Sequence, residues 1–173
     1  MPGRRRAVTL RSVSYAAAME FDLYTLLKIL HIVVVVVGIG SVSLNGLWGN
    51  EAMKAGPNGG AAIGAATIRV NAVAEYFIYA IPVTGILMML LQDEHPWEWG
   101  QTWVWLSIVL YVVALGISHG MQIPSSKRIN ELMASGPPND ETAALEKKLA
   151  MGGTILNLLA VVIIVLMVWK PGV

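Results

Sequence analysis

Charged side chains and cysteine are what this sequence has least of. Of its 173 residues only 13% are charged and none is cysteine, whereas 55% are hydrophobic. A soluble domain carries roughly 25% charged residues, so this composition indicates an environment other than water. The missing cysteines exclude disulfides, thiolate chemistry, iron–sulfur clusters and cysteine-ligated zinc. The net charge of +1 comes without a basic patch interleaved with aromatic residues, so the sequence gives no support for nucleic acid as a partner.

Four long hydrophobic runs take up most of the chain. Crossing the roughly 30 Å hydrocarbon core of a bilayer takes about 20 helical residues, and runs of that length lie at about 24–47, 72–91, 102–121 and 150–169. A backbone in lipid must satisfy its own hydrogen bonds, so even the valine run is expected to be helical. The predicted fold class is all-α: a polytopic membrane protein whose residues 21–173 form one antiparallel bundle of four transmembrane helices.

The segments between these runs are short and polar. Residues 1–20 lack the apolar core of a signal peptide, and we expect a disordered extension there, with Met19 as an alternative start. Glycines predict a flexible turn at 49–60. The run from Pro137 to Glu141 predicts a helix stop followed by a new helix that continues into the fourth hydrophobic run. Pro82 predicts a kink in the second hydrophobic run.

Basic residues predict the orientation. Leaving the amino-terminal extension aside, most of the lysines and arginines gather on the side of the 122–149 loop: Lys54, Arg69, Lys127, Arg128, Lys147 and Lys148. Under the positive-inside rule this loop is cytoplasmic. Both termini are then periplasmic or extracellular, in a multi-pass protein of the cell (inner) membrane.

Ionisable groups inside a span are costly, and each is therefore a functional candidate. His31 lies near the start of the first span, and His119 lies at the end of the third. Asn71, Glu75 and Tyr79 are spaced i, i+4, i+8 and share one face of the second span. An amide, a carboxylate and a phenol on one face are expected to line the bundle interior or to contact a partner, not to face lipid.

Simpler roles are open for each of these residues. His31 could be a packing histidine that bonds to a carbonyl or hydroxyl group on a neighbouring helix. His119 could be solvated at the membrane interface. Glu75 could reach water there, or could pair with Arg69 or Arg128.

Depth in the membrane separates the candidates into two groups. With a rise of about 1.5 Å per residue, Glu75 and His119 lie about 10 Å from the bilayer centre, and His31 lies about 5 Å away on the opposite side. Two histidines about 15 Å apart in depth cannot bind one iron. The sequence therefore predicts a separate His31, with small residues such as Gly85 and Ser107 at its depth. It also predicts one polar intramembrane cluster, made of Asn45, Asn71, Glu75, Tyr79, His119 and Asn157.

Short motifs resemble known membrane families. The run 27–33 (LKILHIV) resembles the start shared by HemJ-type protoporphyrinogen oxidases and copper-resistance-protein-D-like proteins, and the ending 167–171 (MVWKP) is similar to that of their last helix. Ser118-His119, with the basic stretch 127–129 beyond it, is similar to the end of the third span in the oxidases. Over most of residues 24–171 the chain most resembles the branch of small proteins described only as integral membrane proteins.

The resemblance implies a cofactor and its ligands. It implies that His31 is an axial ligand of haem b or a metal ligand, in a redox role related to electron transfer. His119 is the alternative haem ligand. The oxidases also carry a lysine in the third span, and the matching stretch 103–107 has none. The residues themselves do not predict a metal site: adjacent helical residues such as Met88 and Met89 point about 100° apart, not towards one ion.

Three functions stay open at this point. The first is a haem-binding redox protein, and the second is a non-enzymatic subunit of a larger membrane complex or a homo-oligomer. The third is a proton or ion pathway that uses Glu75 and His119. The sequence shows no nucleophile–base pair and no phosphate-binding loop, so it names no catalytic residue.

Overall fold

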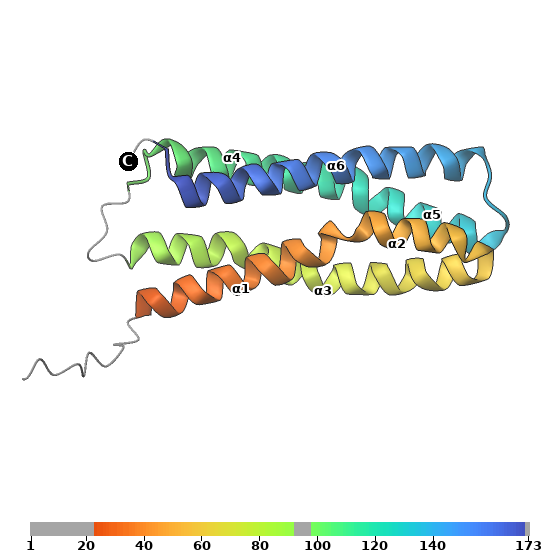
Figure 1. Cartoon of the computed structure of the whole chain (residues 1–173), viewed down its shortest axis with the longest axis horizontal. Helices are drawn as coiled ribbons and strands as arrows, with labels where there is room; N and C mark the ends of the chain where they lie inside the picture. Colours follow the sequence, from red (N-terminus) through yellow and green to blue (C-terminus); the bar gives the residue numbers. More distant parts are fainter. Residues whose placement is uncertain (1–22, 92–97, 172–173) are drawn as a thin grey trace, which may run out of the picture.

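The computed structural model describes residues 23–91 and 98–171. The predictions for residues 1–20 concern a segment outside these ranges. The helical segments of the described part follow one another as α1 (Leu23–Ser43), α2 (Asn45–Lys54), α3 (Gly56–Leu90), α4 (Thr102–Ile117), the π-helical η1 (Ser118–Gln122), α5 (Ile123–Ser135) and α6 (Asp140–Trp169) (Figure 1).

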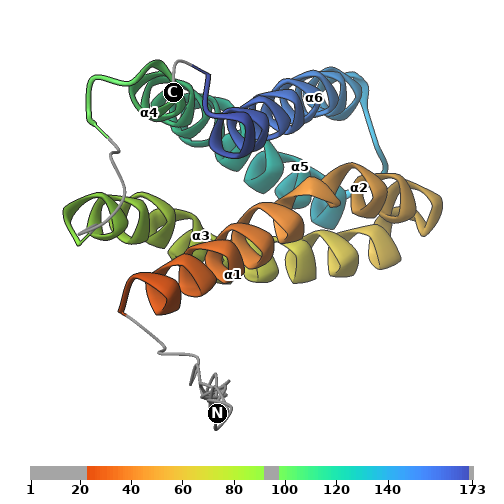
Figure 2. The ribbon, with the colours of Figure 1, turned by 60° about the vertical axis from the view of Figure 1, so that its left-hand side comes forward.

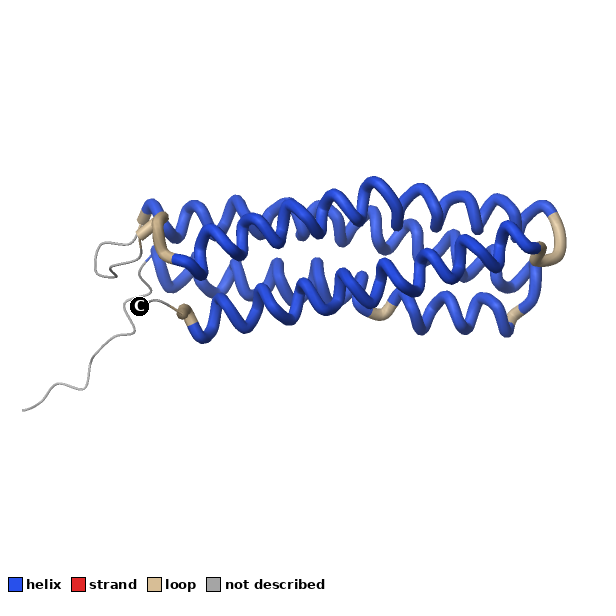
Figure 3. The backbone as a smooth tube through the Cα atoms, turned by 90° about the horizontal axis from the view of Figure 1, so that it is seen from above, coloured by secondary structure: helices blue, strands red, loops and turns tan. Residues whose placement is uncertain are grey.

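These segments form four long rods. A single turn residue, Leu44, separates α1 from α2, and α4, η1 and α5 follow one another without a break (Figure 3). Within the described ranges four helical stretches are long and apolar enough to cross a membrane: Leu23–Lys54, Asn58–Leu90, Thr102–Ser135 and Asp140–Trp169. The predicted all-α, four-span fold class is therefore confirmed.

The rods are longer than a membrane is thick. The 35 residues of α3 extend about 52 Å at 1.5 Å per residue, against roughly 30 Å of hydrocarbon. The surplus lies at one end, where α2, residues 56–71 of α3, α5 and residues 140–149 of α6 run together (Figure 1). We call these four segments the polar extension.

The flexible turn expected at 49–60 is wrong, because most of this stretch is helical. The chain reverses at Ala55 and Gly56, and only Gly56 has a positive φ, of 70°. Backbone N–H groups in the first turn of a helix have no helical acceptor, so the proline that follows Gly56 removes no hydrogen bond from α3. Gly60 lies against the Ala52 carbonyl and the Met133 side chain, where a Cβ would collide with both. Glycine therefore serves close helix packing here.

The expected helix start after the prolines is confirmed. The Asn139 side chain accepts a hydrogen bond from the Thr142 backbone N–H at 3.0 Å, and the Thr142 hydroxyl accepts one from the Asn139 N–H at 3.4 Å. This reciprocal arrangement is a capping box, which satisfies amide groups that the first turn of a helix leaves unpaired. From this cap α6 runs without interruption into the fourth span.

In the membrane half the rods pack as two pairs, α1 with α3 and α4 with α6 (Figure 2). A Cβ on Gly38 of α1 would lie 3.0 Å from the Ile78 backbone nitrogen of α3, so these two helices approach very closely. Trp103 and Val104 of α4 form a small buried core with Leu166 of α6, and Met89 packs against it. A packing role for Met89 follows directly.

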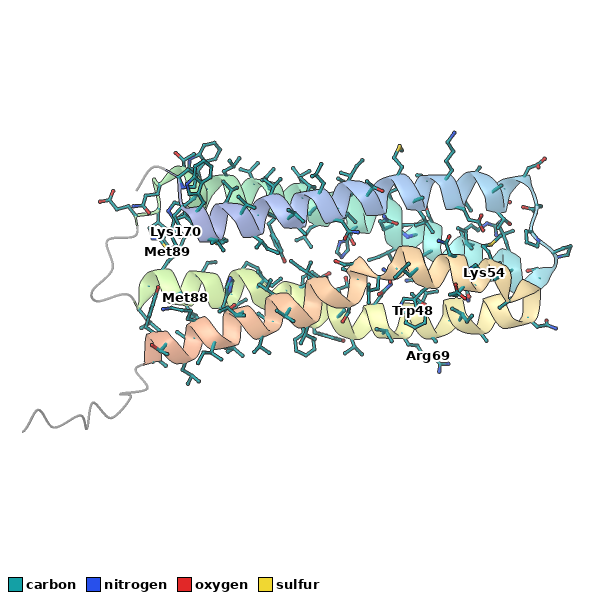
Figure 4. The ribbon with its side chains drawn as sticks, viewed as in Figure 1. Trp48, Lys54, Arg69, Met88, Met89 and Lys170 are labelled. Carbon is teal, nitrogen blue, oxygen red and sulfur yellow. The ribbon has the colours of Figure 1, made fainter. Side chains whose placement is uncertain are left out.

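The end opposite the polar extension carries tryptophans with different surroundings. Trp99 and Trp105 are exposed, as is typical of tryptophans at a membrane interface, whereas Trp103 is only 6% exposed and belongs to the core. The Lys170 ammonium lies 5.6 Å from the centre of the Trp103 ring. Burial, and to a smaller extent the charge of Lys28, lower the pKa of Lys170. Lys170 lies near this end of the molecule, and Lys54 lies near the opposite end, in the polar extension (Figure 4).

Candidate functional site

Three of the residues predicted to form a polar cluster meet where α3 faces η1. The Tyr79 hydroxyl donates to Glu75 Oε1 at 2.5 Å, and His119 Nε2 lies 2.8 Å from the same oxygen. The distance from Nε2 to the Tyr79 oxygen is 2.7 Å, and the two rings are stacked with their centres 6.0 Å apart. We call Glu75, Tyr79 and His119 the triad.

The π-helical segment places the histidine. In η1 the Ile123 N–H bonds to the Ser118 carbonyl, five residues back, and so the helix is locally widened around His119. His119 Nδ1 lies 3.0 Å from the Leu115 carbonyl one turn earlier, which fixes the ring. Single π-helical turns occur often at functional sites. The depth of His119 can be predicted from the sequence, but the π-helical segment cannot. The way in which this segment orients the His119 ring was therefore not predictable.

Hydrogen-bond chemistry defines how many protons the triad holds. A carbonyl oxygen only accepts, so the bond to Leu115 requires a proton on His119 Nδ1. Nε2 and the Glu75 oxygen, 2.8 Å apart, would repel each other as two acceptors unless a further proton lay between them. The pair is therefore either imidazolium with carboxylate or imidazole with carboxylic acid. Both forms hold one proton that can be exchanged.

The triad lies at the outer surface of the bundle and is partly exposed. The side chain of His119 is 44% exposed and that of Glu75 is 32% exposed. A hollow of about 220 Å³ beside them is lined by Ala72, Glu75, Tyr76 and Tyr79. Glu75 does not pair with either of the arginines considered for it. Arg128 pairs with Glu141 at 2.8 Å, and the basic side chain that contacts Glu75 among the described residues is His119.

The other predicted members of the polar cluster do not join the triad. The side-chain oxygens of Asn45 and Asn71 are buried and have no hydrogen-bond partner among the described residues. Asn157 lies on an exposed face of α6, and no hydrogen bond found in the described ranges connects it to the triad. The structure therefore brings together three of the six predicted side chains.

A tyrosine that the sequence reasoning missed holds α4 against α3 next to the triad. Pro82 has no N–H, so the Ile78 carbonyl one turn earlier loses its usual helical donor. The Tyr111 hydroxyl of α4 donates to that carbonyl at 2.9 Å. Ile78 is the neighbour of Tyr79 in the chain, so this bond also fixes the helix segment that carries the triad. A proline in one span, with a tyrosine at a suitable depth in the next, is a signal that could have indicated the pair.

His31 forms a separate site near the other end of the spans. Its Nδ1 lies 2.8 Å from the Thr84 hydroxyl, which is close to the Ala80 and Ile81 carbonyls at 2.9 and 3.0 Å. The hydroxyl has one proton, which it gives to a carbonyl, so it accepts from an Nδ1–H and the Nε2 lone pair of His31 faces elsewhere. Gly85 faces the ring: a Cβ there would lie 3.5 Å from His31 Cε1. Ser107, also expected at this depth, is buried in α4.

The arrangement defines a class of protein: a small integral membrane protein of four spans, with protonatable side chains within the spans. Within the described ranges no three His, Asp or Glu side chains come close enough to hold a metal ion. The chain matches the model of the family described as "Predicted integral membrane protein (DUF2269)" over residues 25–171, and it belongs to that family. No curated protein and no solved structure matches it. The resemblance to this branch of membrane proteins is thereby confirmed.

Proposed function

We propose that this protein transfers protons within the membrane and that the triad is its proton-binding site. The observation that carries the proposal is the 2.8 Å contact between His119 Nε2 and Glu75 Oε1, made while Nδ1 is already committed to the Leu115 carbonyl. Histidine is the side chain that changes charge most readily near neutral pH. Carboxylate and histidine groups inside spans are the usual parts of intramembrane proton relays.

In the proposed cycle the triad accepts a proton from water and later releases it to water. The arriving proton occupies the position between Nε2 and Oε1, and the Tyr79 hydroxyl keeps its own proton and stabilises the carboxylate through its 2.5 Å bond. Loss of the proton leaves two facing acceptors, and the next proton bridges them again. The proposal includes the orientation in which the polar extension is cytoplasmic and both termini are periplasmic, in the cell (inner) membrane.

Proton flux into vesicles tests this function. The purified protein, reconstituted into vesicles that contain a pH-sensitive dye, is expected to speed the collapse of an imposed pH gradient relative to protein-free vesicles. Equal rates would contradict a proton-transfer function of the isolated chain. They would favour the alternative of an accessory subunit, acting as a homo-oligomer or within a larger membrane complex.

A second candidate, haem b binding, is favoured by the surroundings of His31. An axial histidine ligand uses one ring nitrogen for iron and donates its other N–H to a protein acceptor. The bond from Nδ1 to Thr84 fits this pattern, and the absence of a side chain at Gly85 leaves the edge of the ring uncrowded. His31 would then hold a haem, and Thr84 would orient the ring. A bound haem would supply one-electron redox chemistry.

An absorption spectrum separates the haem candidate from the others. If His31 binds haem, the protein purified in detergent is expected to show a Soret band that His31→Ala removes. His119→Ala serves as the matched control and is expected to keep the band, because it lies about 15 Å away in depth. A band that survives in His31→Ala, or no band in wild-type protein supplied with haem, would contradict this assignment.

A further inference from the structure

The polar extension contains a row of buried oxygen atoms that the triad does not use. Its four helices close a ring, in which α2 contacts α3, α3 contacts α5, α5 contacts α6, and α6 contacts α2. Each helix contributes one buried side-chain oxygen that has no hydrogen-bond partner within the described part of the chain: Asn45 Oδ1, Asn71 Oδ1, Asn130 Oδ1 and Glu146 Oε1.

These oxygen atoms are distributed along the axis of the extension. The Asn130 amide lies against Gly64, so it stands at that level of α3. From Gly64 to Asn71 the helix rises about 10 Å, and from Asn71 to Glu75 another 6 Å or so. Glu146 lies on α6 between Glu141, which pairs with Arg128, and Leu149, whose carbonyl accepts a bond from Gln122. A spread of about 10 Å is too long for the ligands of one ion.

Buried acceptors without protein donors are normally satisfied by internal water. A single water bridges atoms a few ångströms apart, so several waters are needed to serve acceptors spread over about 10 Å. The last of the acceptors, Asn71, lies one helical turn from Glu75 on the same face of α3. Waters in this position would connect the triad with the solvent around the polar extension.

We infer that a file of water molecules runs through the polar extension, lined by Asn130, Glu146, Asn45 and Asn71, and that it carries protons between the triad and the solvent on that side. Glu146 is the one carboxyl group among the four side chains that carry these oxygens. It hands a proton to the file by losing it from one oxygen and regains a proton from water. The claim that protons move through the file rests on the proposed function. The position of the file rests on the buried oxygen atoms.

Two measurements test the route: the first is proton flux, and the second is the reaction of an introduced cysteine with silver ions. Glu146→Gln keeps the size of the side chain and removes the proton-exchanging group, so proton flux is expected to fall about tenfold. Glu51→Gln is the control, because Glu51 lies in the same extension but is exposed and pairs only with Lys54 among the described residues. Its flux is expected to equal that of the wild type.

The second measurement uses silver ions, which are small enough to follow a narrow path of water. The chain has no cysteine, so a single introduced thiol is the only one that can react. A thiol reacts as thiolate, which needs water. Asn71→Cys is expected to react with silver added on the side of the extension about tenfold faster than Val73→Cys, because Val73 is 59% exposed on the outer surface at nearly the same depth.

The outcomes separate the route from the proposed function. If Glu75→Gln stops proton flux while Glu146→Gln conducts like the wild type and Asn71→Cys reacts no faster than Val73→Cys, the route is overturned and the triad keeps its function. If the wild type conducts no protons, the proposed function fails, and the role of Glu146 fails with it. Fast reaction of Asn71→Cys together with reduced flux in Glu146→Gln supports the route.

Discussion

Glu75→Gln is expected to lower proton flux by about 100-fold, or to the level of protein-free vesicles. The substitution keeps the shape of the side chain and its contact with Tyr79, but an amide neither takes up nor releases a proton. Groups that exchange protons at a reaction centre contribute about 10²- to 10⁴-fold to rates. Tyr79→Phe is expected to have a smaller effect, because the hydroxyl stabilises the carboxylate and does not hold the exchanged proton.

The measurement is the rate at which a pH gradient collapses across vesicles that contain equal amounts of each variant. Glu51→Gln again serves as the control, since it removes a carboxylate that is exposed and distant from the triad. Its flux should be unchanged. A Glu75→Gln variant that conducts as well as the wild type would show that the triad does not carry the proton.

The proposed orientation predicts that each of four introduced cysteines is labelled from one side of the membrane only. Single cysteines at Asn58 and Ser135 lie at the end of the polar extension, and cysteines at Gly100 and Pro171 lie at the opposite end of the rods. In right-side-out bacterial vesicles, a membrane-impermeant maleimide is expected to label only the cysteines at 100 and 171. In inverted vesicles it is expected to label only those at 58 and 135.

This labelling tests both the number of spans and their direction. The basic residues of the extension favour the cytoplasm under the positive-inside rule. The reverse pattern of labelling would retain the four spans and invert the orientation. Labelling of positions 58 and 135 from opposite sides would contradict the four-span topology itself.

The fold could be predicted from the sequence because lipid leaves few choices. A run of about 20 apolar residues has to be helical in a bilayer, so the four spans followed from length and composition alone. The helical form of 49–60 could not be predicted in this way. The same glycines that serve as turn residues in a loop allow helices to approach closely, and only the position of Ala52 and Met133 against Gly60 distinguishes the two uses.

Helix periodicity and depth in the membrane predict part of the site. The spacing of Glu75 and Tyr79 places them on one face, and depth arithmetic brings His119 to the same level. The membership of Asn157 could not be judged, because the fourth span is apolar on all sides and its rotation about its own axis leaves no trace in the sequence. The π-helical turn at Ser118–Gln122 likewise depends on packing that residue spacing does not reveal.

The central claim is that His119 and Glu75 hold one proton as a coupled pair, and a double-mutant cycle measures that coupling most directly. Thermodynamic stability is measured in detergent for wild type, Glu75→Gln, His119→Gln and the double variant. Charge-assisted hydrogen bonds contribute about 1.5–3 kcal/mol. The side chains of His119 and Glu75 are 44% and 32% exposed, so solvent screening lowers the expected coupling energy to about 1–2 kcal/mol. Additive effects of the two single substitutions would show that the pair is not coupled, and would contradict the account.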